Sequence, residues 1–301
     1  MSLRGPPEDR SPAELLAFGV VALDKPPGPS SHQVSGWIRD AVADALEDAD
    51  AATTVEKAAH AGTLDPKVTG CLPVMLGTAT RLAPVFLEGK KEYVTVLECH
   101  APVPADAEAV IAEFEGEIYQ KPPRKSAVAR RLRTREIHAL ELLETDDRQA
   151  LVRIRCESGT YVRKLCHDLG LALGTGAHMG DLRRTATEPF DDRELHSAYD
   201  LVDALAFWLE DDDPGPLYDA VEPAERILAD LPAVTIAESA AREVANGAPV
   251  YAPGVLEADP ADCDDLVACF TPNDAAVCLG RLVGDPDADS GTVVDLERVL
   301  V

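Results

Sequence analysis

A run of eleven residues, His60 to Gly70, constrains the local fold of this chain more than any other stretch. It reads HAGTLDPKVTG and contains one acidic side chain, Asp65, which stands directly before a proline. A residue before proline is pushed out of the α region, and Gly62 permits a tight turn, so the run predicts a loop. The loop holds a carboxylate outside any helix, although an Asp-Pro pair by itself is more often a structural turn.

A second corner precedes this loop in the sequence. Gly19 to Ser31 reads GVVALDKPPGPSS, an apolar, strand-like run that ends in three prolines and a glycine. These residues predict a stiff, non-helical corner, after which Ser30 or Ser31 can cap a helix that begins near Gln33. Alone, the pattern indicates only a strand, a turn and a helix.

Two downstream segments place an aromatic and a basic side chain close to predicted strands. Lys91, Glu92 and Tyr93 open an apolar strand, where a tyrosine most often serves packing. The alternation of VRIRC over 152–156 predicts a half-buried strand that leads into SGTYVRKL. From these residues alone, Arg163 would be an ordinary charge on a helix surface.

Taken in order, these segments resemble the motifs of the TruB/dyskerin family of pseudouridine synthases. GTLDP is similar to the family's catalytic loop, KPPGPSS to its first motif and SGTYVRKL to its GTYIRSL segment. GAHMGDLRRT, at 176–185, resembles the family's GAHMxxLRRT. The resemblance covers about residues 19–190 and implies an α+β fold, with a mixed, mainly antiparallel sheet flanked by helices.

The resemblance also implies roles for individual residues. Asp65 would be the catalytic residue, either as a nucleophile at C1′ or as a general base at the 2′ position, and the sequence leaves both open. Tyr93 would stack on the flipped base, and Arg163 would pair with a buried Asp65 carboxylate and keep it ionised. Arg184 would be a further basic group for the nucleotide, and a structural role for His60 remains equally open. The other implied substrate-binding residues are His60, Leu182 and Arg183.

This chemistry needs no metal or redox cofactor, and we predict none. The seven cysteines form no CxxC pair, and their odd number favours reduced thiols in a cytoplasm. No apolar run approaches the roughly 18 residues of a membrane span, so we predict no membrane association.

The net charge of −26, from 28 basic and 54 acidic residues, is unusual for an RNA-binding protein, because phosphate contacts need Lys and Arg. Such an acidic excess resembles proteins of salt-in halophilic archaea, where the Debye length is about 3 Å in molar salt. Residues 121–135 hold seven basic side chains and no acidic one. A solvated surface loop is the alternative to RNA contact. We predict RNA binding by Lys121, Arg124, Lys125, Arg130, Arg131 and Arg133.

We divide the chain into an N-terminal arm over 1–17, a catalytic domain over 18–230 and a C-terminal domain over 231–301. The arm is predicted to be flexible, although archaeal members of the family often dock theirs. Residues 44–54, acidic and rich in alanine, are predicted to be a solvated insertion. ANGAPVYAPGV, at 245–255, resembles the PUA domain, a small RNA-binding β-barrel, and a generic small β-domain is the alternative. It follows a predicted helix closed by Gly247 and precedes strands predicted at 266–270 and 276–280.

Three functions remain open. In the one we favour, the chain is the catalytic subunit of an archaeal H/ACA ribonucleoprotein, with a guide RNA selecting uridines in rRNA and small protein subunits as partners. In the second, it acts alone on uridine 55 in the T-loop of tRNA. The third is a catalytically silent RNA-binding scaffold, against which the presence of Asp65, Tyr93 and Arg163 argues.

Overall fold

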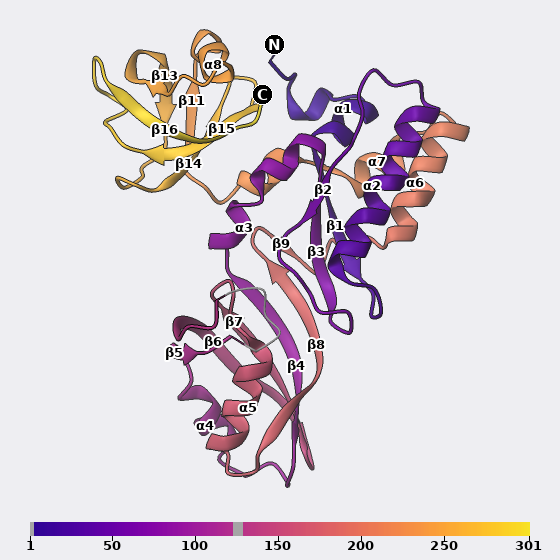
Figure 1. Ribbon diagram of the computed structural model, residues 1–301, viewed down its shortest axis with the longest axis vertical. Coiled ribbons are helices and arrows are strands. Elements are labelled where there is room, and N and C mark those ends of the chain that lie inside the picture. Colours follow the sequence, from indigo (N-terminus) through magenta and orange to yellow (C-terminus); the bar gives the residue numbers. More distant parts are fainter. Residues whose placement is uncertain (1–2, 123–128) are drawn as a thin grey trace.

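The computed structural model describes residues 3–122 and 129–301. Within them the strands form one ten-stranded sheet and one six-stranded sheet, which lie in separate parts of an elongated molecule (Figure 1). The main path of the long sheet runs β10-β1-β3-β8-β4-β7-β6-β5, with β2 beside β3 and β9 beside β8. Only the β3–β8 pair is parallel in this sheet, so the predicted mixed, mainly antiparallel sheet is confirmed.

The half of the long sheet around residues 19–25 and 69–76, called here the upper half, is buried on both faces. Alternate side chains of β1 (Gly19–Lys25) and β3 (Thr69–Leu76) point into two different cores, which explains their near-continuous apolar sequence. One core contains residues of α1 (Pro12–Ala17) and of three later helices, and the other continues into the C-terminal sheet. The later helices are α2 (Ser31–Asp48), α6 (Ala198–Glu210) and α7 (Gly215–Ala220).

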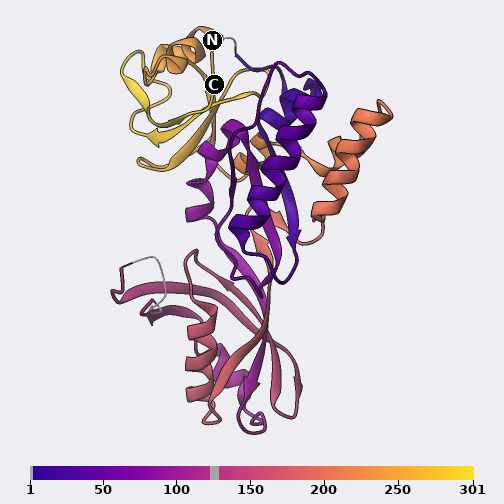
Figure 2. The ribbon, with the colours of Figure 1, turned by 45° about the vertical axis from the view of Figure 1, so that its right-hand side comes forward.

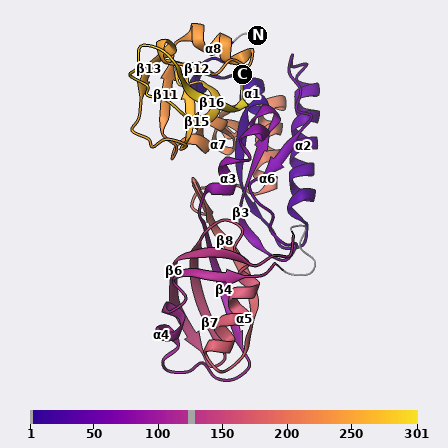
Figure 3. The same ribbon diagram turned by 60° about the vertical axis from the view of Figure 1, so that its left-hand side comes forward.

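The lower half of the long sheet forms a separate lobe, called here the lower lobe. Its sheet packs against two helices around a third core, and the alternating burial of the strand over 149–156 matches its predicted period. Figures 2 and 3 show that the long strands β4 and β8 join this lobe to the upper half. Its elements are β4 (Lys91–Cys99), α4 (Ala107–Ala112), β5 (Gly116–Gln120), β6 (Arg133–Asp146), β7 (Gln149–Cys156), α5 (Val162–Ala172) and β8 (Ala177–Thr187).

The C-terminal sheet has the order β12-β16-β15-β14-β11-β13 and a core of its own. The predicted helix closed by a glycine is present as α8 (Glu238–Ala245), and Gly247 has the left-handed φ of +93° that favours glycine. The two predicted strands are also confirmed. The strands of this sheet are β11 (Ala233–Ile236), β12 (Val250–Tyr251), β13 (Val255–Ala258), β14 (Leu266–Phe270), β15 (Ala276–Leu282) and β16 (Thr292–Val299).

Short elements connect these parts. The short strands are β2 (Ala58–His60), β9 (Phe190–Asp191) and β10 (Glu222–Pro223). The short helices are η1 (Pro7–Asp9), α1 (Pro12–Ala17), η2 (Gly77–Leu82), α3 (Val85–Glu88), η3 (Ala224–Leu228) and η4 (Ala252–Gly254).

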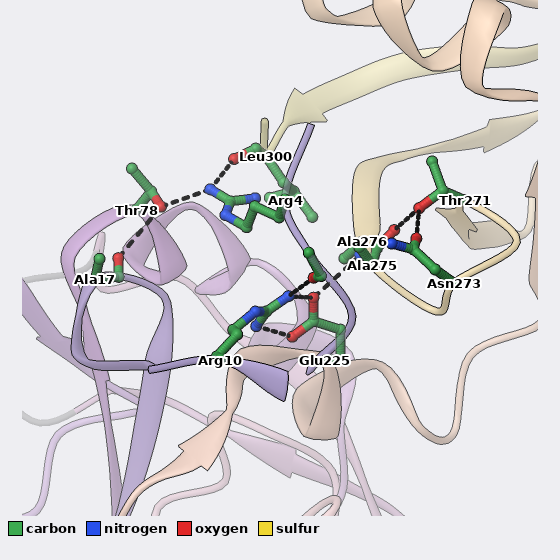
Figure 4. A network of polar contacts seen from close by, with 11 residues as sticks. Arg4, Arg10, Ala17, Thr78, Glu225, Thr271, Asn273, Ala275, Ala276 and Leu300 are labelled. Carbon is green, nitrogen blue, oxygen red and sulfur yellow. Dashed lines mark hydrogen bonds and ion pairs between the residues drawn. The ribbon is translucent and has the colours of Figure 1, made fainter. Parts of the chain in front are cut away.

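The prediction of a flexible N-terminal arm is wrong for its described residues. Arg4 donates hydrogen bonds to the Leu300 carbonyl at 2.5 Å and to Thr78 at 2.9 Å. Arg10 forms a two-pronged ion pair with Glu225, at 2.8 and 2.6 Å, and Glu225 also accepts the Ala276 amide at 3.1 Å (Figure 4). These contacts hold the arm between the long sheet and the C-terminal sheet.

The predicted insertion over 44–54 also needs correction. Helix α2 continues to Asp48, and Ala45 and Leu46 are buried in the core. The first half of the segment is therefore the last turn of a packed helix, because two apolar side chains among the acidic ones still face inward.

Candidate active site

Asp65 lies in the loop between β2 and β3, and the upstream proline-rich corner holds this loop in place. The fully buried Lys25 Nζ donates to the carbonyls of Pro26, Pro66 and Val68, at 2.9, 3.0 and 2.8 Å. Burial lowers the pKa of Lys25, and the nearby Asp65 carboxylate opposes that shift. The proline-rich corner and the loop that carries Asp65, which are separate in the sequence, thus form one structural unit.

A hydroxyl group fixes the same loop at a second point. The buried Ser31 hydroxyl donates to the Leu64 carbonyl at 3.0 Å and accepts the Leu64 amide at 2.8 Å. The Gly28 amide adds a bond to the Pro66 carbonyl at 2.8 Å. With both neighbours of Asp65 held through their backbones, the carboxylate has a defined starting position.

Arg163 of α5 donates through Nη2 to Asp65 Oδ2. The two side chains are 59% and 55% exposed, so our expectation of a buried carboxylate is wrong. The pair spans the junction between the upper half and the lower lobe, where both partners face solvent. An exposed ion pair adds little stability. The main effect of Arg163 is therefore to orient the carboxylate rather than to stabilise the fold.

Tyr93 and Leu182 lie where two of the cores meet. Tyr93 on β4 is half-buried, stands opposite Arg184 on β8 and packs against the core of the upper half and that of the lower lobe. Burial raises the pKa of the Tyr93 hydroxyl, while the adjacent Arg184 guanidinium acts in the opposite direction. Leu182 is also half-buried and contacts the same two cores, so both residues adjoin the junction that Asp65 and Arg163 bridge.

The two arginines of the LRR segment have different environments. Arg183 forms a two-pronged contact with Asp24, at 2.8 and 3.1 Å, and this hydrogen bonding raises the pKa of Arg183. Arg184 is only 1% exposed and donates to the carbonyls of Cys71 at 2.7 Å and Gly62 at 3.2 Å. Our expectation that Arg184 offers a basic group to the nucleotide is therefore wrong, because its guanidinium holds the start of the catalytic loop.

A glycine permits the close approach of β3 and β8 at this point. Gly70 has a φ of +98°, and a Cβ there would lie 2.2 Å from the Arg184 carbonyl oxygen. No other residue fits without separating the strands, so Gly70 helps to place Arg184 under the loop.

His60 ends β2 and is half-buried. Burial lowers the pKa of His60, and the nearby Arg184 and His32 lower it further. Its Nδ1 atom is buried and has no hydrogen-bond partner among the described residues. Burial and the neighbouring charges therefore favour the neutral form of the ring.

The basic run begins next to the turn that leads to Arg163. The buried Gln120 side chain accepts the Tyr161 amide at 2.8 Å and donates to the Tyr161 carbonyl at 3.2 Å. Gln120 thus ties the end of β5 to this turn, a role that no local sequence pattern indicates. Of the predicted RNA-binding residues, Lys121, Arg130 and Arg131 are exposed and Arg133 is half-buried, while Arg124 and Lys125 lie outside the described residues.

Neither a metal cluster nor a membrane-spanning helix occurs in the described part of the chain. It holds no group of three or more His, Cys, Asp or Glu side chains that could bind a metal. None of its helices combines the length and apolar character needed to cross a membrane.

Family models match almost the whole chain. The model described as "TruB family pseudouridylate synthase (N terminal domain)" matches residues 51–105 and 98–162, and "tRNA pseudouridylate synthase B C-terminal domain" matches 163–229. "PUA domain" matches 232–300 and "DKCLD (NUC011) domain" matches 5–35.

Full-length relatives agree with these matches. The chain is 63% identical to "Probable tRNA pseudouridine synthase B" of Halobacterium salinarum, with 100% of both chains covered. It is 44% identical to the protein of the same name from Pyrococcus abyssi, with 99% of this chain and 88% of the relative covered.

Two solved structures share the fold over nearly the full length. One is "Crystal Structure of a Cbf5-Nop10-Gar1 Complex", at 43% identity and a TM-score of 0.90, covering 100% of this chain and 90% of the other. The other is "Structure of H/ACA RNP bound to a substrate RNA containing 2'-deoxyuridine", at 42% identity and a TM-score of 0.88, covering 99% and 90%. The chain belongs to the TruB family of pseudouridylate synthases, isomerases that act on uridine in RNA.

Proposed function

We propose that Asp65 is the catalytic carboxylate with which this chain converts uridine to pseudouridine. The observation that carries the proposal is the Asp65–Arg163 pair, exposed on a loop that Lys25, Ser31 and Arg184 hold by its backbone. A carboxylate that is accessible, oriented and fixed in this way suits attack on a nucleotide that enters from solvent.

The reaction breaks the C1′–N1 bond, turns the uracil and rejoins it through C5. The target nucleotide first leaves its stack, at a cost of a few kcal/mol. Asp65 then acts as a nucleophile at C1′ or as a general base at the 2′ position, and both roles require the ionised carboxylate. Arg163 engages Oδ2, so Oδ1 is the oxygen that we assign to the substrate.

Four neighbouring residues would hold the flipped nucleotide. We assign Tyr93 to stacking on the base and Leu182 to the apolar wall beside it, since both adjoin the junction of the two halves. We assign His60, half-buried at the end of β2, to positioning the nucleotide. Arg183 is paired with Asp24 and Asp192, so we assign it to contact with the nucleotide only where a phosphate displaces one of these carboxylates.

We further propose that the chain works as the catalytic subunit of an RNA-guided H/ACA ribonucleoprotein, with guide RNA and small protein subunits as its partners. Its likeness to Cbf5 in a complex with Nop10 and Gar1 extends over the N-terminal arm and the C-terminal sheet as well as the catalytic part, which supports this role. The free cysteines support a reducing cytoplasm as its location. The second candidate, independent action on tRNA, is supported by the names of the full-length relatives.

Pseudouridine formation at molar KCl tests both candidates. One reaction contains a tRNA transcript and the chain alone, and the other contains an rRNA fragment with an H/ACA guide and partner proteins. Turnover confined to the guided reaction supports the ribonucleoprotein role, and turnover on bare tRNA supports independent action. Absence of turnover in both reactions would remove the catalytic proposal and leave an RNA-binding scaffold.

A further inference from the structure

Strand β4 ends and β8 begins at the far end of the lower lobe (Figure 1). Two exposed histidines, His100 and His178, contact each other there. His100 Nε2 lies 3.2 Å from His178 Nδ1, and the ring centroids are 5.4 Å apart with an angle of 35° between the planes. The proposed reaction at Asp65 uses neither residue. Both are exposed, so packing in a core does not explain their contact.

The backbone fixes the two histidines on neighbouring strands. The His100 amide donates to the Gly176 carbonyl at 2.9 Å, and His178 stands opposite Glu98 in the β4–β8 ladder. The His100 ring lies against Gly176, where a Cβ would come within 3.0 Å of its Nδ1 atom. Helix α5 packs closely against the start of β8, since a Cβ on Gly170 would lie only 2.1 Å from the Ala177 amide nitrogen. The site is therefore built on rigid elements.

The spacing of the two ring nitrogens fits a shared metal ion. Zinc binds histidine nitrogen at about 2.0–2.1 Å, so two such ligands in a tetrahedral sphere lie about 3.3 Å apart. The 3.2 Å between His100 Nε2 and His178 Nδ1 is close to that value, and both rings are exposed to solvent. Imidazole suits zinc, nickel and copper, whereas magnesium and calcium prefer oxygen ligands.

We propose that His100 and His178 form a two-histidine binding site for a divalent transition-metal ion of the zinc, nickel or copper type. Because no third His, Cys, Asp or Glu in the described residues completes a cluster, water molecules fill the remaining positions and the site stays open. The ion would join the end of β4 to the start of β8. The same pair of strands carries Tyr93 and Arg183 at its other end, so the metal braces the ladder on which the active site is built.

Calorimetric titration of the untagged full-length chain with ZnCl₂ and with NiCl₂, at neutral pH and without chelators, tests the proposal. We expect binding of a single ion, and His100→Ala and His178→Ala should each weaken it at least about tenfold. His138→Ala is the control, since His138 lies on another strand, β6, with Glu136 at 3.4 Å. Absence of binding, or equal affinity in all variants, would overturn the proposal and leave a plain hydrogen bond between the two rings.

Two further readouts separate a site from incidental binding elsewhere. The electron paramagnetic resonance spectrum of bound Cu²⁺ should show coupling to two imidazole nitrogens in the wild type and lose it in the double variant. Zinc should raise the thermal midpoint of the wild type and leave that of the double variant unchanged, because only the native site binds the ion. A spectrum unchanged by the double substitution would place the ion elsewhere, for example at His32 and His60, and contradict the assignment.

Discussion

Two ion pairs at the two junctions of this molecule differ in burial. Arg10 and Glu225 meet between the arm, the long sheet and the C-terminal sheet, with side chains only 3% and 10% exposed. Arg163 and Asp65 meet between the upper half and the lower lobe and are more than half exposed. A buried charge that loses its partner is costly, whereas an exposed one is solvated by water. We infer that the first pair serves folding and that the second serves the reaction.

The largest effect should come from Asp65→Asn, which keeps the shape of the side chain and removes its charge. We expect pseudouridine formation to fall by more than about a thousandfold, in line with the loss of a catalytic group that acts as part of a unit. Single-turnover assays on guided substrate measure the rate, and unfolding curves should coincide with wild type. Asp203→Asn, on the exposed side of α6, is the control and should keep full activity. Residual activity of Asp65→Asn above about 1% of wild type would contradict the catalytic role.

Arg10→Ala, in contrast to Asp65→Asn, should lower the stability of the fold. It leaves the Glu225 carboxylate buried without its guanidinium, which costs about 3–5 kcal/mol of unfolding free energy. Chemical denaturation measures the loss. The double variant Arg10→Met with Glu225→Leu removes both charges and should recover much of it, although the Ala276 amide also loses its acceptor. If Arg10→Ala is as stable as wild type, the burial of this pair has no structural consequence.

A buried lysine should make the free energy of unfolding depend on pH. Burial lowers the pKa of Lys91 to about 8, and its ammonium donates to the carbonyls of Phe86 and Gly89 at 2.9 and 3.0 Å. The unfolded state holds this proton up to its ordinary pKa near 10.5, so between pH 8 and 10.5 it binds more protons than the folded state. Stability should therefore rise with pH across that window, by about 3 kcal/mol in total.

Buried thiols, among them Cys71 and Cys156, oppose this trend. Burial raises the pKa values of Cys71 and Cys156 to about 11, so their contribution to stability falls above pH 9. The measurement is therefore the difference between wild type and Lys91→Met, followed by denaturation at several pH values. A pH-independent difference between the two proteins would contradict the assignment to Lys91.

The basic residues at 130–133 should affect binding without affecting folding. Replacing Arg130, Arg131 and Arg133 with serine should weaken RNA retention on filters and reduce the slope of log affinity against log salt by about 2, at roughly 0.7 for each lost phosphate contact. Unfolding free energy should stay near wild type. Arg148→Ser, another exposed arginine, is the control. Unchanged affinity would show that the run is only a solvated face.

Arg163→Ala should change stability only slightly. Removing an exposed partner costs at most about 1 kcal/mol of unfolding free energy, yet activity should fall because Asp65 loses its orientation. Chemical denaturation and the single-turnover assay on one preparation measure the change in stability and the change in activity. Arg163→Lys separates charge from geometry, since lysine keeps the charge but lacks the planar guanidinium. A large loss of stability in Arg163→Ala would contradict the division between folding and reaction.

Much of the fold was predictable because its signals are local. Alternating polarity marks β7, turn residues bound the strands at 266–270 and 276–280, and Gly247 ends α8. The predictions failed where distant contacts override local character. The arm is predicted to be flexible, but Arg4 and Arg10 bind residues in other parts of the chain. Arg184 is predicted to be a basic group for the nucleotide, but it donates to a backbone carbonyl instead.

The sequence by itself determined the family and the position of Asp65 in a loop, because proline and glycine restrict the backbone wherever they stand. Only the tertiary structure decided that Lys25 and Ser31 hold that loop, that the carboxylate faces solvent and that His100 meets His178. These features depend on contacts between residues far apart along the chain. Their burial and pairing are set by the folded surroundings, which no local pattern of residue types specifies.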